Sequence, residues 1–306
     1  MSQNSDKTKD LFSHLFSESR SYWWNCDFLS LIAKRWELKD ARKVLDVGCG
    51  TGDWSRALAP NFNNETLVYG IDIDLRYLQK AIQLYRNKNS KIEFQFINGK
   101  VEDLAFQESS FDIATCQSLL IHVENIEIAI AEMLRVLKPG GRIIIAEPLK
   151  MIPMISCNPQ LSFEMIDEYF DSVKFELICH RGKYTLGDGS MSATDDLVDI
   201  LLKLGVNKIE SYLSDKISLM TPPFSSPEEK SWISDLKNNY TSDIIDWSKD
   251  QTKKYFVAGG GDANDFDRHW KRAREDTKLL IDHFQNHTES FISSKLMCLI
   301  SGIKPL

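Results

Sequence analysis

Residues 44–52 read Val-Leu-Asp-Val-Gly-Cys-Gly-Thr-Gly, and this stretch decides the fold. It opens with a β-branched and aliphatic run of the kind found in a buried central strand. Three glycines follow within five residues, and they allow positive φ angles and a close approach of a ligand to the backbone. Asp53 is a suitable N-cap for a short helix that ends before Pro60. Strand, glycine turn and helix together form the geometry with which open α/β sheets bind nucleotide cofactors.

The spacing of the glycines indicates which cofactor is bound. The dinucleotide fingerprint is G-x-G-x-x-G, whereas this loop is G-x-G-x-G with an aspartate two residues ahead of it. The stretch resembles motif I of the class I S-adenosylmethionine-dependent methyltransferases. The resemblance implies that the methionine and ribose of S-adenosylmethionine are cradled by Asp46, Gly48, Cys49, Gly50 and Gly52.

A second buried strand is predicted over residues 66–74, and it ends in acids. Asp72 lies 20 residues beyond Gly52, where an acid can accept hydrogen bonds from ribose hydroxyls. The resemblance assigns this role to Asp72 and packs the adenine on Ile73. Asp74 is the better candidate for capping the helix that follows, which leaves Asp72 to the ligand.

The alternating residues 92–97 predict a third strand, and the loop 98–104 follows it. This loop resembles the one that meets the adenine edge in the same methyltransferases. By position, the backbone N–H of Val101 and the side chain of Glu102 take that role, with Asp103 as the alternative acceptor.

The pattern of Phe-Asp, then Leu-Lys-Pro-Gly-Gly-Arg and an apolar run resembles the later motifs of this family. It predicts strands over 110–116 and 142–146, with a helix over 126–137 that Lys-Pro-Gly-Gly ends. Gln117 comes at the carboxyl end of the fourth strand, where ligands bind in open α/β sheets, and is therefore a candidate cofactor contact. The resemblance covers residues 40–148.

His122 is the candidate catalytic residue, because it follows the fourth strand next to the expected reaction zone. Its position resembles that of a histidine common in the family, which could act as a general base or brace the loop. His180 and Arg181 could also reach a substrate. Glu147, at the tip of the fifth strand, could bind a cationic substrate or cap a turn.

We expect an α/β, Rossmann-like, seven-stranded mixed sheet with helices on both faces, plus a helical cap. In order, the expected parts are an N-terminal helical lid 1–40, a cofactor-binding core 41–148, a first cap insertion 149–193, a core helix and strand 194–213, a second cap insertion 214–290 and a final core strand 291–306. In the lid, Tyr22 either lines the cofactor pocket or packs in the core. The first insertion predicts a helix over 162–178, and three glycines at 259–261 in the second predict a hinge.

The amino-acid composition limits the classes of partner that the protein is expected to bind. The net charge of −7 and the absence of a basic stripe argue against nucleic acid. The six cysteines are scattered without a C-x-x-C pair, which favours reduced thiols in the cytoplasm over disulfides. No apolar run approaches the roughly 20 residues that cross a membrane. No ligand set for a metal stands out, and the sequence does not indicate the oligomeric state.

The sequence therefore predicts an S-adenosylmethionine-dependent methyltransferase. It would move a methyl group to an O, N or C nucleophile of a small molecule by in-line displacement and release S-adenosylhomocysteine. Three alternatives stay open: a methyltransferase acting on RNA or protein, a non-catalytic cofactor-binding module, and a dehydrogenase.

Overall fold

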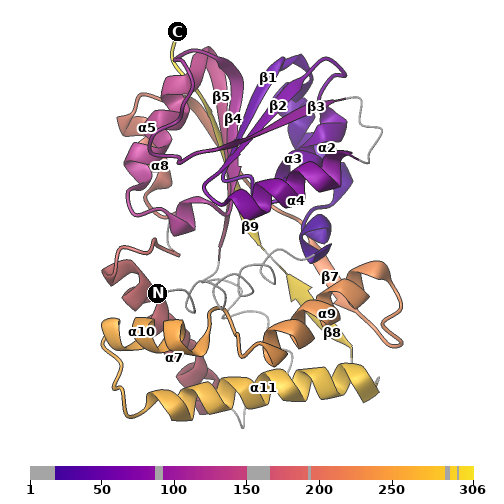
Figure 1. The fold of residues 1–306 in the computed structure, drawn as a ribbon, viewed down its shortest axis with the longest axis vertical. Coiled ribbons are helices and arrows are strands. Elements are labelled where there is room, and N and C mark those ends of the chain that lie inside the picture. Colours follow the sequence, from indigo (N-terminus) through magenta and orange to yellow (C-terminus); the bar gives the residue numbers. More distant parts are fainter. Residues whose placement is uncertain (1–17, 87–91, 150–165, 192–193, 287–289, 295) are drawn as a thin grey trace. The chain divides into compact units, whose positions relative to one another are not determined.

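The computed structural model describes residues 18–86, 92–149, 166–191, 194–286, 290–294 and 296–306. The chain divides into two compact units, drawn in Figure 1. The sheet unit consists of residues 24–150, 191–216 and 296–306. The helical unit consists of residues 1–23, 151–190 and 217–295.

The sheet unit is built on a seven-stranded sheet with the strand order β3-β2-β1-β4-β5-β9-β6. Its strands are β1 Lys43–Val47, β2 Leu67–Asp72, β3 Glu93–Asn98, β4 Phe111–Gln117, β5 Leu137–Pro148, β6 Asn207–Leu213 and β9 Met297–Ile303. The first five strands pair in parallel, and β9 runs antiparallel to both of its neighbours. The expected seven-stranded mixed sheet is confirmed.

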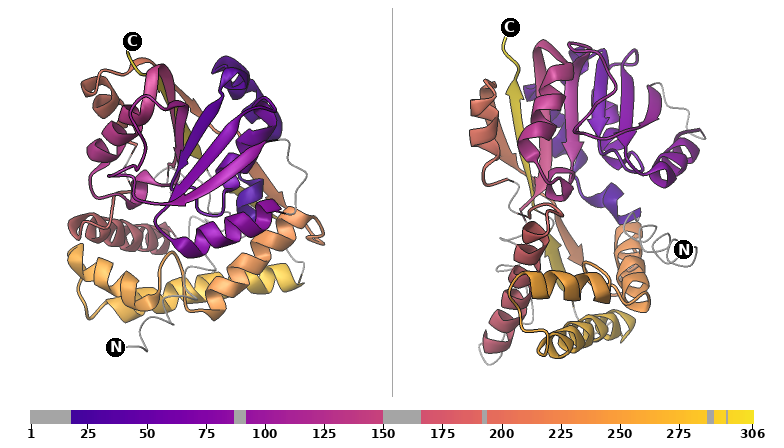
Figure 2. Two further views of the ribbon diagram at one scale, coloured as in Figure 1. Left: turned by 45° about the horizontal axis from the view of Figure 1, so that its top comes forward. Right: turned by 60° about the vertical axis from the view of Figure 1, so that its left-hand side comes forward.

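Helices cover both faces of this sheet (Figures 1 and 2). They are α2 Cys26–Arg35, α3 Asp53–Leu58, α4 Leu75–Arg86, α5 Ile126–Val136 and α8 Leu197–Lys203, with short 3-10 turns η2 Leu38–Asp40, η3 Ala59–Asn61 and η4 Leu120–His122. Leu45 and Val47 of β1 share one apolar cluster with α5 and α8. Because side chains alternate along a strand, Asp46 faces the opposite side, where Ser55 of α3 donates to it.

The strand β5 is longer than the sequence predicts. It begins at Leu137 and includes the Lys-Pro-Gly-Gly stretch that was expected only to end the preceding helix. The C-terminal segment explains the difference, because the Gly140 N–H donates to the carbonyl of Lys304 and the Lys304 N–H donates to that of Gly141. Backbone partners distant in sequence therefore extend the strand past its proline.

The stretch 291–306 supplies two strands in two different sheets. In the sheet unit, β9 pairs between β5 and β6. In the helical unit, β8 Phe291–Ser294 pairs antiparallel with β7 Ile217–Met220. The sequence of the stretch does not show this division, since both halves are apolar and strand-like.

The helical unit contains the four longer helices α7 Ile166–Thr185, α9 Pro227–Thr241, α10 Lys249–Ala258 and α11 Phe266–Asn286, and the turn η1 Glu18–Tyr22. The helix α11 runs alongside the other three (Figure 1). One aromatic cluster joins α7, α10 and α11 around Phe256 and Phe266, and a second joins α9, α11 and β8 around Phe284. The expected placement of this unit as a cap stays a prediction.

A close backbone contact joins α7 to α10. A Cβ atom added to Gly182 would lie 1.7 Å from the carbonyl oxygen of Tyr255, and one added to Gly259 would lie 1.9 Å from that of Ile178. The helix α7 runs through Gly182 to Thr185, beyond the end expected near residue 178, while the start expected at 162–165 lies outside the described residues. The glycine that was expected to form a hinge instead packs against a neighbouring helix.

We expect Gly182→Ala to destabilise the helical unit by about 1–3 kcal/mol or more, because the new methyl group has no space. The sign of the change in the free energy of unfolding is informative, because Gly→Ala inside an exposed helix ordinarily stabilises by about 1 kcal/mol. Thermal unfolding followed by circular dichroism measures the change. The exposed substitution Val257→Ala on α10 is the control and should change stability by less than about 0.5 kcal/mol. An unchanged or raised melting temperature for Gly182→Ala would contradict the close contact.

Candidate cofactor site

The carboxyl ends of β1, β2 and β4 meet at one edge of the sheet. Val47 is paired with Ile71 of β2 on one side and with Cys116 of β4 on the other. The strand order reverses between β1 and β4, because the chain goes on from β1 to β2 and β3 before it returns. Open α/β sheets bind their ligands at such a reversal. This edge is therefore the candidate site, and the predicted glycine loop lies on it.

The glycine loop has a conformation that side chains would prevent. Gly48, Gly50 and Gly52 all have positive φ angles, of 66°, 54° and 78°. A Cβ atom at Gly48 would lie 2.6 Å from Cδ1 of Leu119, and one at Gly52 would lie 2.8 Å from the ring of Tyr85. The loop thus needs glycine both for its backbone angles and for its contacts. The N–H of Cys49 donates to the Ile71 carbonyl at 3.0 Å and ties the loop to β2.

Asp72 holds the middle of this loop. Its Oδ2 accepts the N–H of Gly50 at 2.8 Å, and its Oδ1 accepts the N–H of Asp74 at 2.9 Å. Each carboxylate oxygen has a second acceptor position, so the same group can still receive ribose hydroxyls. Burial raises the pKa of Asp72, and the two backbone N–H groups oppose this change. Ile73 beside it is 65% exposed and offers an apolar surface for a base.

Asp46 is a buried carboxylate directly below the loop. Only 1% of the residue is exposed. Its Oδ2 accepts the Ser55 hydroxyl at 2.5 Å, while Oδ1 has no hydrogen-bond partner among the described residues. Burial raises the pKa of Asp46 to about 7; the hydrogen bonds from Ser55 lower it, and the nearby Asp72 raises it further. A cationic group placed near the loop would lower this pKa again.

The end of β4 is shaped by Glu147, which is completely buried on β5. Its Oε1 accepts the backbone N–H groups of Leu119 and Leu120, each at 2.8 Å. Of the two roles open for Glu147, these contacts favour the capping of a turn. Just before them, Ser118 takes a positive φ of 52°. The sequence did not predict the two backbone partners of Glu147 or the positive φ of Ser118. A buried acid in an otherwise apolar strand is the one signal of the brace in the sequence.

The structure places the other predicted residues as follows. Gln117 is buried at the end of β4, one residue after Cys116, which pairs with Val47 of β1. His122 ends η4 with an exposed side chain. Val101 is 7% exposed and belongs to the core, whereas the side chains of Glu102 and its alternative Asp103 are exposed after β3. Tyr22 lies in η1 of the helical unit, so its role at the cofactor stays a prediction.

These residues fit S-adenosylmethionine. The cofactor carries a sulfonium and an ammonium, and the loop has two carboxylates near it, one of which keeps an unpartnered oxygen. Asp72 would hold the ribose, Ile73 would pack on the adenine, and the glycine loop with Asp46 and Gln117 would hold the methionine end. The positive φ angles leave the backbone of the loop open to the ligand.

Comparisons with known proteins agree with this geometry. A family model described as a methyltransferase domain matches residues 38–193, about half of the chain. Demethylmenaquinone methyltransferase of Staphylococcus carnosus is 30% identical over 169 residues, which are 55% of this chain and 67% of that protein. The Staphylococcus aureus protein of the same name is 31% identical over 146 residues, 47% of this chain and 57% of the relative. A crystal structure of a candidate methyltransferase from Bacillus halodurans shares the fold, with a TM-score of 0.50, 17% identity, and 92% and 99% of the two chains covered.

The chain therefore belongs to the methyltransferase domain family, and its fold is that of the class I S-adenosylmethionine-dependent methyltransferases. The alignments span about six-tenths of the length of the curated relatives. The substrates of those relatives are therefore not assigned to this chain. Within the described ranges, no group of three or more His, Cys, Asp or Glu is arranged to hold a metal ion. The part of the chain that the structure describes also contains no helix long and apolar enough to cross a membrane.

We expect the apo protein to lose stability as the pH rises through the range in which Asp46 ionises. The pKa of about 7 in the folded state lies well above the ordinary pKa of an aspartate, so between these two values the folded state holds a proton that the unfolded state has released. The stabilisation is complete below pH 4 and falls by up to about 1.4 kcal/mol per pH unit until pH 7. Asp46→Asn removes this pH-dependent contribution to the free energy of unfolding. The stability of the variant relative to the parent should therefore rise from pH 4 to pH 7 and then stay level.

Melting temperatures measured from pH 4 to pH 8 without cofactor test this expectation. Asp40→Asn, which removes an exposed carboxylate of η2, is the control. A pH dependence of the Asp46→Asn difference no larger than that of the control would contradict an ionisable, buried Asp46.

Proposed function

We propose that this protein transfers the methyl group of S-adenosylmethionine to a small-molecule acceptor. The observation that carries the proposal is the glycine loop held by Asp72 above the unpartnered oxygen of Asp46. Membership of the methyltransferase domain family supports the chemistry, and the names of the relatives support a small acceptor. The net charge of −7 makes RNA an unfavourable partner.

S-adenosylmethionine supplies a methyl group that its sulfonium already activates. The residues of this chain then have to hold the acceptor in line with the S–CH₃ bond and exclude water, which can supply on the order of 7–11 kcal/mol. An acceptor that keeps a proton must also lose it. His122 is the residue that we propose as its base, because its exposed imidazole follows β4 on the edge that carries the loop.

Incubation of the protein with methyl-labelled S-adenosylmethionine and a metabolite extract tests the proposal. We expect label in one or more small molecules, identified by mass spectrometry. The amount of S-adenosylhomocysteine formed should equal the amount of methyl group transferred. A second incubation, with a whole-cell extract, also offers protein and RNA as acceptors. Label found only in that protein or RNA would contradict a small acceptor. Cofactor binding without transfer to any acceptor would contradict catalysis.

We expect Asp72→Ala to weaken the binding of S-adenosylhomocysteine by about tenfold to 150-fold, equivalent to about 1.5–3 kcal/mol for hydrogen bonds to a charged group. The loss combines the missing ribose acceptor with the release of the Gly50 N–H. Calorimetry measures the affinity. Asp74→Asn is the matched control, because this neighbouring acid pairs with Arg76 and lies directly before α4. Equal affinities of the two variants would remove Asp72 from the site.

We expect His122→Gln to lower turnover by about 10²-fold and to leave cofactor affinity unchanged. If His122 is the base, the rate should rise with pH through an apparent pKa of about 6–7. Turnover with the acceptor found in the extract, measured against pH, tests the role. Glu124→Gln, an exposed substitution two residues further on, should leave turnover unchanged. Normal turnover of His122→Gln with a lower melting temperature would instead mean that His122 braces its loop.

A further inference from the structure

Trp24 lies in the sheet unit, directly before α2, and its indole packs against the helix that follows the glycine loop. The ring is stacked on that of Phe28 in the first turn of α2, with centroids 6.4 Å apart. It also contacts the ring of Trp54, with centroids 5.0 Å apart. Trp54 is the second residue of α3, and Gly52 of the loop is the N-cap of that helix. Trp24 is therefore one side chain away from the end of the glycine loop.

The contacts of Trp54 connect Trp24 to one side of the candidate cofactor site. The indole of Trp54 donates to the hydroxyl of Thr115 on β4 at 2.8 Å. Thr115 is paired with Asp46 of β1, so the two side chains lie on the same face of the parallel sheet. Asp72 ends β2, which lies on the other side of β1. Trp24 thus belongs to the β4 side of the site and Asp72 to the β2 side.

The indole N–H of Trp24 is a buried donor without an acceptor. Only 7% of the residue is exposed, and Nε1 has no hydrogen-bond partner within the part of the chain that the structure describes. Two other buried indoles of the sheet unit do have acceptors, since Trp54 donates to Thr115 and Trp36 donates to Glu210, each at 2.8 Å. A buried donor that lacks an acceptor loses its hydration without compensation, so proteins seldom leave one.

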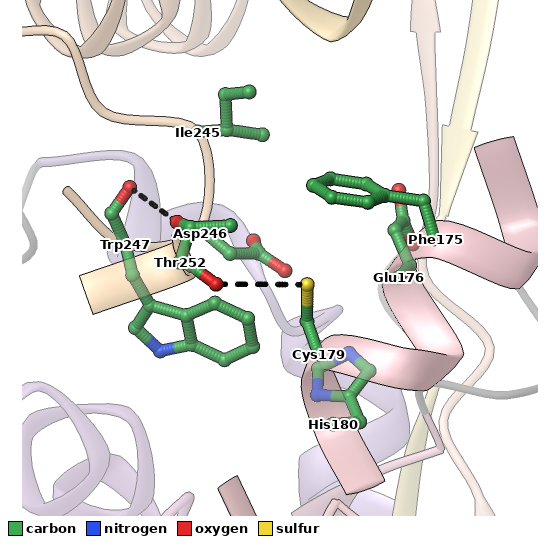
Figure 3. Close-up of a pocket in the computed structure, with 8 residues that line it drawn as sticks. All are labelled: Phe175, Glu176, Cys179, His180, Ile245, Asp246, Trp247 and Thr252. Atoms are coloured by element: carbon green, nitrogen blue, oxygen red, sulfur yellow. Dashed lines mark hydrogen bonds between the residues drawn. The ribbon is translucent and has the colours of Figure 1, made fainter. Parts of the chain in front are cut away.

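A small cavity in the helical unit, between α7 and α10, shows the more usual arrangement of buried polar groups (Figure 3). Thr252 in its wall is 4% exposed, and the hydroxyl lies 2.8 Å from the carbonyl oxygen of Ser248 and 3.3 Å from that of Trp247. The thiol of Cys179 lies 4.0 Å from the carbonyl oxygen of Thr252. These buried groups use acceptors of the protein itself, whereas the Trp24 N–H is left for a ligand.

Trp24 and Asp46 present complementary groups to a ligand on the β4 side. Nε1 of Trp24 needs an acceptor, and the unpartnered Oδ1 of Asp46 needs a donor. The methionine end of S-adenosylmethionine carries both, because its carboxylate only accepts hydrogen bonds and its ammonium donates them. The adenosine end is assigned to Asp72 and Ile73 on the β2 side, so the methionine end is the part of the cofactor that would reach Trp24.

We propose that the indole N–H of Trp24 donates to the carboxylate of the methionine moiety of S-adenosylmethionine, while Asp46 faces the ammonium. The inference rests on the proposed function, because it adds a residue to the same cofactor site. A hydrogen bond to an ionised acceptor is about twice as strong as one between neutral groups. An indole also suits a position near Asp46, since it has no charge. A lysine or arginine there would pair with Asp46 and compete with the ammonium.

Calorimetry with two ligands tests the assignment. S-adenosylhomocysteine carries the carboxylate, whereas decarboxylated S-adenosylhomocysteine keeps the adenosine, the sulfur and the ammonium but lacks it. Trp24→Phe keeps an aromatic ring and removes the N–H. We expect it to weaken the binding of S-adenosylhomocysteine by about tenfold or more and to leave the affinity for the decarboxylated ligand unchanged. Trp36→Phe is the matched control at the C-terminal end of α2 and should change neither affinity.

NMR of the parent protein with isotope-labelled indole nitrogens keeps the test decisive if Trp24→Phe does not fold. The chain has seven tryptophans, and a hydrogen bond to a carboxylate moves an indole N–H signal downfield. We expect one such signal to move when S-adenosylhomocysteine binds and to stay in place with the decarboxylated ligand. In a folded Trp24→Phe variant this signal should be missing.

Three results would overturn the proposal. They are an unchanged affinity of Trp24→Phe for S-adenosylhomocysteine, an equal loss of affinity for both ligands, and no indole signal that responds to the carboxylate. The equal loss would mean that Trp24 only supports the loop or binds a bridging water. A parent protein that binds neither ligand would contradict the cofactor site itself and, with it, the proposed function.

Discussion

The hydrogen bond from the Gly50 N–H to Asp72 is the interaction on which the cofactor site depends. It joins the loop after β1 to the end of β2, two segments that the parallel sheet brings side by side. The loop can accept this position only because glycines tolerate its φ angles. One carboxylate thereby fixes the loop, and we propose that the same group accepts the hydroxyls of the ribose. Its substitution should therefore affect the shape of the site as well as its contacts.

Electrostatics give the same edge of the sheet a preference for cations. Asp46 is buried and Asp72 largely so, and the charge of Asp72 raises the pKa of Asp46. Burying two acids that repel each other costs stability in the apo protein. A cationic ligand offsets that cost, because it stabilises both ionised carboxylates. The arrangement suits S-adenosylmethionine better than a dinucleotide, whose pyrophosphate is negative.

Local sequence predicted the parts of the site that lie on one segment. The sequence predicted the glycine loop, Asp72 and Gln117 as site residues because their spacing follows the order of strands and turns in an open α/β sheet, and the structure places them at the ends of β1, β2 and β4. The sequence left two roles open for Glu147 and could not single out the capping of a turn, since its partners Leu119 and Leu120 follow β4, in the turn before His122. The Ser55 hydrogen bond to Asp46 was missed for a similar reason, because only the return of α3 onto the sheet brings them together.

Prediction of the fold from the sequence was limited in the same way, by contacts between distant segments. The order of strands and helices followed from apolar runs and turn residues, whereas strand β5 was too short in the prediction because its extension pairs with the C-terminal segment. The division of 291–306 between two sheets depends on partners at β7 and β5 that are distant in sequence. Likewise, the packing role of Gly182 and Gly259 becomes visible only when α7 and α10 are side by side. Contacts between distant segments decided each of these features.

Hydrogen–deuterium exchange with and without S-adenosylhomocysteine tests the central claim most directly, because it reports on the backbone of the loop itself. We expect the ligand to slow exchange in peptides that cover the glycine loop at 46–54 and the end of β2 at 70–75. Exchange should change little in β6, at the far edge of the sheet. Saturable binding that leaves exchange at 46–54 and 70–75 unaltered would contradict the assignment of this loop as the cofactor cradle.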